Sequence, residues 1–426
     1  MGNQLAAHPV LVAAPFLRLG DLLGFHGPRA LTWFAALPTA LFSTAAIGLL
    51  WRLSRELGWS DAAARAAAFL LATQWLAIGF ASMPFPRPIS TALLLAGFVL
   101  VARPDAGRLA AFGAGAAAAA AMAVRWSEGV AVVPLAAFAL WRTRRPARTL
   151  AVLAGFAVGL ALFVGLFDAA TAGSPFATLR AFVEFSRASP SWSGDRGVRP
   201  WYWYATNVLG WAGPALVLIA AFGARDRRAW TPLLVALAAV VLLSFSPVKR
   251  PRYLQAAVPF LAMAAGLGWE RLRRRRGWLA TAALVAAAAL GLERTLHMLR
   301  HKSMAAAAAA AALSAMTDPP RVVVLEQSWA YGGALAFPPG TEIRDITPRR
   351  ALRADALRSV ARGADVVALY AEDLAEPADR LLGEAFRPCA TLRVPDSPDV
   401  VVFLLGSRAC SALVLAPGVS GSGPGS

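Results

Sequence analysis

Long apolar runs, separated by short loops that carry arginine or proline, are the feature that most constrains this chain. Each run approaches the ~20 residues that an α-helix needs to cross a hydrocarbon core of ~30 Å. The composition agrees, because only 15% of the 426 residues are charged, whereas a soluble domain carries about 25%. The sequence therefore predicts an all-α polytopic membrane bundle of about ten helices. The predicted spans are residues 31–50, 63–80, 89–102, 109–123, 129–141, 149–167, 207–223, 231–247, 253–269 and 277–293.

The segments on either side of residues 31–293 are less apolar. Residues 1–30 are interrupted by Arg18, Asp21 and His26, so we expect an interfacial or re-entrant segment rather than a span. Residues 294–319 contain an alanine run at 305–312, and the high helix propensity of alanine predicts a helical connector.

Beyond the connector, the hydrophobic pattern changes to that of a small α/β domain, which we expect at residues 320–410. Strand-like runs occur at 321–325, 365–370 and 400–405, beside an amphipathic helical stretch near 350–362. Residues 411–426 are rich in glycine and serine, which is typical of a flexible tail. Two cysteines, Cys389 and Cys410, are a possible disulfide pair that spacing alone does not decide.

The arginines give the predicted bundle an orientation. The basic loops 141–148, 225–228 and 271–276 fall on one side when every span is counted, and the positive-inside rule makes that side cytoplasmic. The long 168–206 loop and the small C-terminal domain then lie outside the cytoplasm. This topology explains most of the net charge of +18 without nucleic acid as a partner. The alanine- and arginine-rich composition suggests a bacterial inner membrane.

Five cations lie at the non-cytoplasmic mouths of the predicted spans, where this rule predicts few. They are Arg87, Arg125, Lys249, Arg250 and Arg252, of which all but Arg250 are retained as ligand candidates. Guanidinium groups bind pairs of phosphate oxygens, and lysine adds a point charge, so these residues are candidates for binding a lipid phosphate. The alternative is that they reach lipid headgroups or cap helix ends.

Aromatic residues gather where the long outer loop meets the next span. Trp201, Tyr202, Trp203 and Tyr204 follow Pro200 directly. They form either an interfacial aromatic belt or a platform for a sugar or a prenyl chain, since flat rings stack on apolar faces.

The carboxylates on the same side are candidates for a catalytic base. They are Glu128, Asp168, Glu184 and Asp195, of which Glu128 and Asp195 are retained as catalytic candidates although none has a partner at a telling spacing. The sequence has no His-Glu-x-x-His and no Cys-x-x-Cys, so no metal is assigned and a divalent cation is not indicated.

Several motifs occur in one order along the chain. Val124-Arg125-Trp126 comes first, Gly173-Ser174-Pro175-Phe176 leads to Arg199-Pro200-Trp201-Tyr202-Trp203-Tyr204, and Lys249 with Arg252-Tyr253 and Pro259 comes last. In this order they resemble the GT-C type glycosyltransferases, closest to the polyprenyl-phosphate-mannose-dependent mannosyltransferases of lipid-linked oligosaccharide and GPI-anchor assembly. The resemblance covers residues 8–270. We expect the first span and acidic first outer loop of that family to be missing here.

The resemblance implies an enzyme that transfers a hexose such as mannose from a polyprenyl-phosphate carrier to a hydroxyl of a lipid- or glycan-linked acceptor. Membrane lipids, the lipid-linked donor and the acceptor are then the partners, and the polyprenyl-phosphate sugar is a substrate rather than a cofactor. Two alternatives stay open at this point. One is a transporter or flippase for a lipid-linked glycan, although no inverted repeat is evident. The other is a non-catalytic partner subunit.

Overall fold

Prolines mark where several helices of the computed structural model begin. Helices α5 (Pro86–Ala102), α8 (Pro146–Leu160) and α14 (Pro214–Gly223) each have proline in their first turn. Proline suits this position because its fixed φ is helical and its missing N–H would have no intrahelical partner there. The short proline-bearing loops of the sequence are therefore helix starts.

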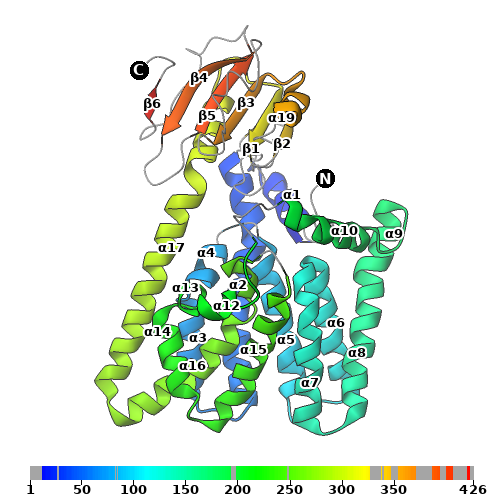
Figure 1. Ribbon diagram of the computed structural model, residues 1–426. Helices are drawn as coiled ribbons and strands as arrows, with labels where there is room; N and C mark the ends of the chain where they lie inside the picture. Colours follow the sequence, from blue (N-terminus) through cyan, green and yellow to red (C-terminus); the bar gives the residue numbers. More distant parts are fainter. Residues whose placement is uncertain are drawn as a thin grey trace. The chain divides into compact units, whose positions relative to one another are not determined.

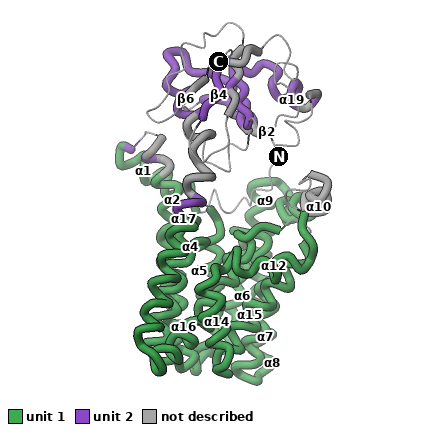
Figure 2. The backbone as a smooth tube through the Cα atoms, turned by 60° about the vertical axis from the view of Figure 1, so that its left-hand side comes forward, with its two compact units in different colours: residues 1–24, 33–295 green, residues 25–32, 296–426 purple. Residues whose placement is uncertain are grey.

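The structure describes residues 12–25, 28–81, 83, 85–192, 198–246, 249–326, 337, 340–346, 354–370, 386–393, 400–405 and 420–422. The chain divides into two compact units, shown in Figure 2. The first comprises residues 1–24 and 33–295, and the second comprises residues 25–32 and 296–426.

The first unit is a helical bundle. In addition to the helices above it contains α1 (Ala14–Leu22), α2 (Pro28–Glu56), α3 (Asp61–Ala72), α4 (Trp75–Ala81), α6 (Arg108–Val124), α7 (Val132–Thr143), α9 (Phe167–Ala172), α10 (Ala177–Trp192), α12 (Trp203–Thr206), α13 (Val208–Trp211), α15 (Trp230–Ser244), α16 (Val258–Arg275) and the start of α17 (Gly277–Ser314). A π-helical turn, η3 (Ala161–Leu166), joins α8 to α9, and the 3-10 turns η2 (Trp126–Ala131), η4 (Arg227–Ala229) and η5 (Pro251–Leu254) lie between longer helices.

The predicted spans coincide with these helices. Every one of them overlaps at least one helix of the bundle. Within the described residues, 4 helices are long and apolar enough to cross a membrane, and α3 with α4, bent by 57°, makes a fifth if the pair is one span. Helices α5, α6 and α14 are apolar but shorter. The polytopic helical class is thus confirmed, while the number of crossings stays a prediction.

Glycines let α6 and α8 approach each other closely. A Cβ atom added at Gly155 would collide with the backbone carbonyl of Phe112, and one added at Gly115 would collide with that of Val152. Small residues at helix contacts are the usual means of close packing in membrane bundles. Figure 1 shows α5, α6, α7 and α8 side by side, and α14 packs on α16 in the other half of the bundle.

The second unit is built on a 6-stranded sheet with the order β2-β1-β3-β5-β4-β6. Its elements are β1 (Val322–Glu326), β2 (Glu342–Ile346), α19 (Ala354–Ala361), β3 (Val366–Tyr370), β4 (Phe386–Arg393), β5 (Val400–Leu405) and β6 (Ser420–Ser422). Strands β1, β2 and β3 are parallel, whereas β5, β4 and β6 pair antiparallel. Residues Ala309 and Leu313 of α17 pack in one core with Val323 and Val366 of the sheet. The small α/β domain is therefore present as predicted.

Three local expectations need correction. The 168–206 segment contains α10 and is not an extended loop, because its first half has helical periodicity. The predicted tail contributes β6, which pairs with the edge of β4, whose backbone groups are otherwise open to a further strand. The span at 277–293 and the connector at 294–319 join in one continuous helix, α17. Cys389 is disulfide-bonded, and Cys410 lies outside the described residues.

We predict that Gly115→Ala lowers the melting temperature of the detergent-purified protein by several degrees. The added methyl group would meet the backbone of α8, and overpacking of this kind costs about 1–3 kcal/mol. Gly113→Ala on the same helix is the matched control, because its Cβ would lie 3.7 Å from Leu100 Cδ1, an ordinary contact. Equal melting temperatures for the two variants would contradict the close α6–α8 contact.

Candidate anion site in the helical bundle

Arg87 is a fully buried cation at the start of α5. Phe85 is the N-cap residue and Pro86 begins the helix, so Arg87 lies in the first turn. Its side chain is only 1% exposed. The guanidinium carbon lies 4.9 Å from the ring centre of Phe85, 5.0 Å from that of Tyr253 and 5.9 Å from that of Phe80. Aromatic faces attract cations by about 0.5–2 kcal/mol each, so these rings hold the buried guanidinium in place.

Arg125 enters the same site from the end of α6. The helix ends at Val124, and Arg125 has an extended backbone before the η2 turn begins. Its guanidinium carbon lies 5.2 Å from the ring centre of Tyr253. The Nε atom forms an ion pair with Glu128 Oε1 at 3.5 Å. Glu128 is 3% exposed, so this carboxylate belongs to the buried site.

Arg252 and Tyr253 come from η5, far along the chain. The guanidinium carbon of Arg252 lies 5.7 Å from the ring centre of Phe85. Two rings therefore connect three cations, because Phe85 lies next to Arg87 and Arg252, while Tyr253 lies next to Arg87 and Arg125. We call Arg87, Arg125 and Arg252 the arginine cluster.

Among the described residues, the three cations of the arginine cluster are accompanied by one buried carboxylate, Glu128. Arg125 and Arg252 are close enough to Arg87 for their charges to repel it, and Glu128 offsets this only in part. Within the described residues, Nε and Nη1 of Arg87 are buried without a hydrogen-bond partner, and so is Oγ of Ser127. Buried donors without partners are costly. Three guanidiniums and unused N–H groups are suited to binding an anion with several oxygen atoms, such as a phosphate.

Lys249, the fourth predicted phosphate ligand, binds backbone carbonyls and, within the described part of the chain, has no ring contact with the arginine cluster. Its ammonium donates to the backbone carbonyls of Arg199 at 3.1 Å and Ser246 at 2.5 Å. The side chain is 4% exposed. Lys249 therefore ties two loop segments together, and none of the aromatic contacts of the arginine cluster involves it.

The four aromatic residues predicted as a platform do not share one surface. Trp201 is 74% exposed and Tyr202 is 50% exposed, whereas Tyr204 is fully buried. The Tyr204 hydroxyl accepts from the backbone N–H of Arg250 at 3.3 Å, and the Trp203 ring packs on the Tyr204 ring. Tyr204 thus fixes the loop next to Arg252, and only the first two residues of the four present open faces.

The four acids predicted as candidate bases do not share one environment. Asp168 is buried and accepts from the backbone N–H and the hydroxyl of Thr178, at 2.8 and 2.7 Å, which explains it as a cap for the start of α10. Glu184 is exposed on α10. Asp195 lies outside the described residues. Glu128 is the acid that the structure brings to the arginine cluster.

The sequence reasoning missed the rings of Phe80, Phe85 and Tyr253 as parts of the site. The signal was present in Phe85-Pro86-Arg87 and in Arg252-Tyr253, where an aromatic residue lies close to each cation in the chain. Among the described residues there is no group of three or more histidine, cysteine, aspartate or glutamate side chains that would hold a metal ion.

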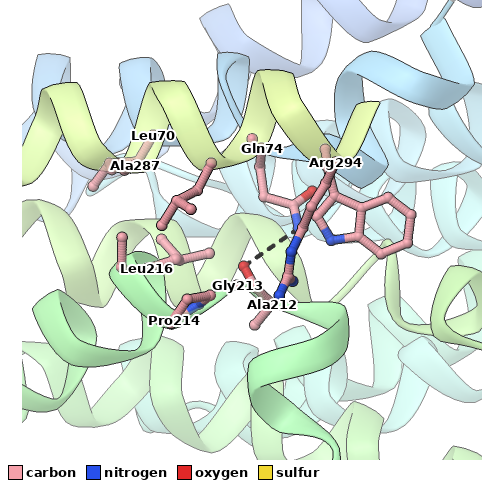
Figure 3. A pocket seen from close by; sticks show the side chains of 12 residues that line it. Leu70, Gln74, Ala212, Gly213, Pro214, Leu216, Ala287 and Arg294 are labelled. Atoms are coloured by element: carbon pink, nitrogen blue, oxygen red, sulfur yellow. Dashed lines mark hydrogen bonds between the residues drawn. The ribbon is translucent and has the colours of Figure 1, made fainter. Parts of the chain in front are cut away.

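A pocket elsewhere in the bundle, between α3, α14 and α17, is lined mainly by apolar residues (Figure 3). Its polar groups are already bound to the backbone. Arg294 Nη1 donates to the carbonyls of Leu209 and Gly210 at 2.9 Å each, and Gln74 Nε2 donates to that of Trp211 at 3.0 Å. Arg294 and Gln74 therefore have a structural role, which is to bind the backbone of residues 209–211.

The Alg9-like mannosyltransferase family matches residues 6–328 of the chain, most of its length. The chain belongs to this family. As a member of the Alg9-like family it is a membrane glycosyltransferase, and the expectation of a GT-C type enzyme is confirmed. No curated protein sequence matches it.

Solved structures support the GT-C fold of this Alg9-like protein. The apo structure of ArnT from Cupriavidus metallidurans has a TM-score of 0.57 at 16% identity, covering 93% of this chain and 88% of that one. The same enzyme bound to undecaprenyl phosphate has a TM-score of 0.58 at 15% identity, covering 94% and 88%. The arabinofuranosyltransferase AftD from Mycobacteria has a TM-score of 0.51 at 17% identity, covering 95% of this chain but 36% of that one.

We predict that Arg87→Met does not lower the melting temperature of the ligand-free protein. The substitution removes a buried cation that two neighbouring cations repel, together with two N–H groups without partners, and methionine still fills the space between the rings. Arg103→Met, an exposed substitution at another helix end, serves as the control. A drop of several degrees for Arg87→Met alone would show that the guanidinium stabilises the fold and is not held for a ligand.

Proposed function

We propose that this protein transfers a hexose, with mannose as the expected sugar, from a polyprenyl-phosphate carrier to a hydroxyl of a lipid- or glycan-linked acceptor. The observation that carries the proposal is the arginine cluster, in which aromatic rings hold three guanidiniums together against their repulsion. A phosphate carried by a lipid is the anion that a buried site in a membrane bundle would meet.

The comparisons support the nature of this donor. ArnT, whose fold this chain shares, has been solved with undecaprenyl phosphate bound, and the family is one of mannosyltransferases. The acceptor that we propose is a hydroxyl of a glycan or a glycolipid. The alanine- and arginine-rich composition favours a bacterial inner membrane. The positive-inside pattern favours the non-cytoplasmic side for the arginine cluster and for the C-terminal residues.

The chemistry follows from the placement of the charges. The acceptor oxygen attacks the anomeric carbon, the bond between that carbon and the phosphate oxygen breaks, and the polyprenyl phosphate leaves with the electron pair. Its charge grows during this step, so the guanidiniums bind the leaving group more strongly in the transition state than in the ground state. A carboxylate takes the proton of the acceptor hydroxyl.

Glu128 is better suited to positioning Arg125 than to taking that proton. It lies 3.5 Å from a guanidinium of the proposed phosphate site, which is the leaving-group side of the sugar. A base that assists attack from the opposite face must lie on the other side of the ring, as in inverting sugar chemistry. Asp195, the other catalytic candidate from the sequence, is proposed as the base. Trp201 and Tyr202, with their open faces, are proposed to stack on the sugar or the prenyl chain.

We predict that Arg125→Ala and Arg252→Ala each lower the rate of sugar transfer from undecaprenyl-phosphate mannose by about 10–100-fold. Each variant removes charge-assisted hydrogen bonds to the phosphate, worth about 1.5–3 kcal/mol. Transfer is measured with radiolabelled donor and native membranes as the source of acceptor. Arg103→Ala, which removes a solvent-exposed arginine, is the control with unchanged turnover. Unchanged turnover in both cluster variants would remove the phosphate site from the proposal.

We predict that Glu128→Gln raises the KM for the donor several-fold with little change in kcat. Burial raises the pKa of the Glu128 carboxyl above its ordinary value, although Arg125 and Arg87 oppose this. As the pH falls through that raised pKa, the carboxylate is protonated and Arg125 loses its partner, so the KM of the unchanged enzyme should rise towards that of the variant. The variant should show no such pH dependence.

Two companion variants separate the roles of the acids. Glu184→Gln, on the exposed face of α10, should behave like the unchanged enzyme. Asp195→Asn should lower kcat and leave the donor KM nearly constant. A collapse of kcat in Glu128→Gln, with its KM unchanged, would instead make Glu128 the base.

A further inference from the structure

A small cavity in the bundle, lined mainly by apolar residues, reaches Pro88, the residue that follows Arg87 on α5. It is bounded by α2, by α3 and α4, by the first turns of α5 and by the segment between η5 and α16. Its lining includes Pro88 and Thr91 of α5, Gln255, and Ser43 of α2. The space admits about one water-sized molecule, which is also the size of one hydroxyl group.

Two oxygen atoms of this lining are buried and unused. Oγ1 of Thr91 and Oε1 of Gln255 have no hydrogen-bond partner among the described residues. Thr91 is 5% exposed and Gln255 is 4% exposed, so bulk solvent does not supply one. An amide oxygen accepts a hydrogen bond, while a threonine hydroxyl can donate one. A single hydroxyl group entering the cavity would satisfy both, by donating to Gln255 and accepting from Thr91.

Both unused oxygen atoms belong to residues that closely follow a proposed phosphate ligand in the chain. Thr91 is four residues after Arg87 on α5, which places the two on one face about one helical turn, ~5.4 Å, apart. Gln255 follows Arg252 by three residues, across the end of η5. In a polyprenyl-phosphate sugar the ring is joined directly to the phosphate, so its hydroxyls are only a few bonds away from the anion.

We infer that Gln255 and Thr91 form a subsite for one hydroxyl group of the donor sugar, next to the phosphate held by the arginine cluster. The inference rests on the proposed function, because it assigns the sugar end of the same donor. It makes these two residues determinants of sugar specificity, since a donor lacking that hydroxyl would leave buried oxygen atoms unpaired. The residues contact the sugar and not the reacting bond.

The test measures binding of two carriers to the detergent-purified full chain. The probes are undecaprenyl phosphate and undecaprenyl-phosphate mannose, titrated against the unchanged protein, Gln255→Leu and Thr91→Val. Each variant should lower the affinity for the sugar-bearing carrier about 3–10-fold, the effect of one hydrogen bond, and change the affinity for the bare carrier less than about twofold. Thr281→Val, an exposed threonine of α17, is the matched control and should change neither affinity.

Sugar analogues sharpen the test. A set of monodeoxy-mannosyl carriers should contain one analogue that the unchanged protein and Gln255→Leu bind equally well, and that analogue identifies the hydroxyl. Because the oxygen atoms have no partners, neither variant should lower the melting temperature, and Thr91→Val serves alone if Gln255→Leu does not fold.

The outcomes separate this inference from the proposed function. Unchanged affinity of both variants for the sugar-bearing carrier would overturn the inference alone and leave the cavity as a water site. An equal loss of affinity for both carriers would also overturn it, since the effect would then lie on the phosphate. Failure of the unchanged protein to bind either carrier would overturn the proposed function itself.

Discussion

Repulsion among three guanidiniums, contained by aromatic rings, is the constraint on which the rest of this site depends. Arg87, Arg125 and Arg252 carry three positive charges, and Glu128, the buried carboxylate that the described residues place beside them, pairs with Arg125. Phe85 and Tyr253 each lie within reach of two of the cations, and their faces offset part of the repulsion. Unfavourable arrangements of this kind are expected at functional sites, and this is the reason for proposing that the arginine cluster binds an anion.

The bundle gives this cluster its geometry. Arg87 lies in the first turn of α5, Arg125 follows the last residue of α6, and Arg252 belongs to the turn before α16. The rings of Phe85 and Tyr253 contact cations from all three elements. In addition, α5 packs on α6, and α6 packs closely on α8 through the glycine contacts. Helix packing thus determines the separation of the charges, which no local sequence pattern specifies.

The loop that carries Tyr204 supports the third cation. Its buried hydroxyl accepts from the N–H of Arg250, and Lys249 binds two backbone carbonyls of the neighbouring segments. Both residues look like ligands in the sequence, because a tyrosine and a lysine near a membrane surface are common in binding sites. Their contacts show a different role, which is to hold η5 in place.

The three arginines of the site were predicted from their charge and from their position in the predicted topology. Arg87, Arg125 and Arg252 stood out because the positive-inside rule leaves few cations on their side of the bundle. The sequence could not show that Lys249 would donate to backbone carbonyls, because one of them belongs to Arg199, far away in the chain. Nor could it show that Asp168 would cap α10, because that contact depends on the shape of the turn before the helix.

The fold was predictable to a similar degree. Apolar runs located the helices of the bundle and strands β1, β3 and β5, which are neighbours in the interior of the strand order. Strand β2, with the sequence Glu-Ile-Arg-Asp-Ile, is rich in charge, and β4 contains Pro388 at a shift in register. Both lack the continuous β-branched pattern by which a strand is identified, so their pairing depends on neighbours that only the fold supplies.

The most direct measurement is a cryo-electron microscopy structure of the full chain with undecaprenyl phosphate. We expect phosphate density within hydrogen-bonding distance of the guanidiniums of Arg87, Arg125 and Arg252, with Glu128 still paired to Arg125. Phosphate density elsewhere on the bundle, with the three guanidiniums still facing one another across the rings, would contradict this expectation.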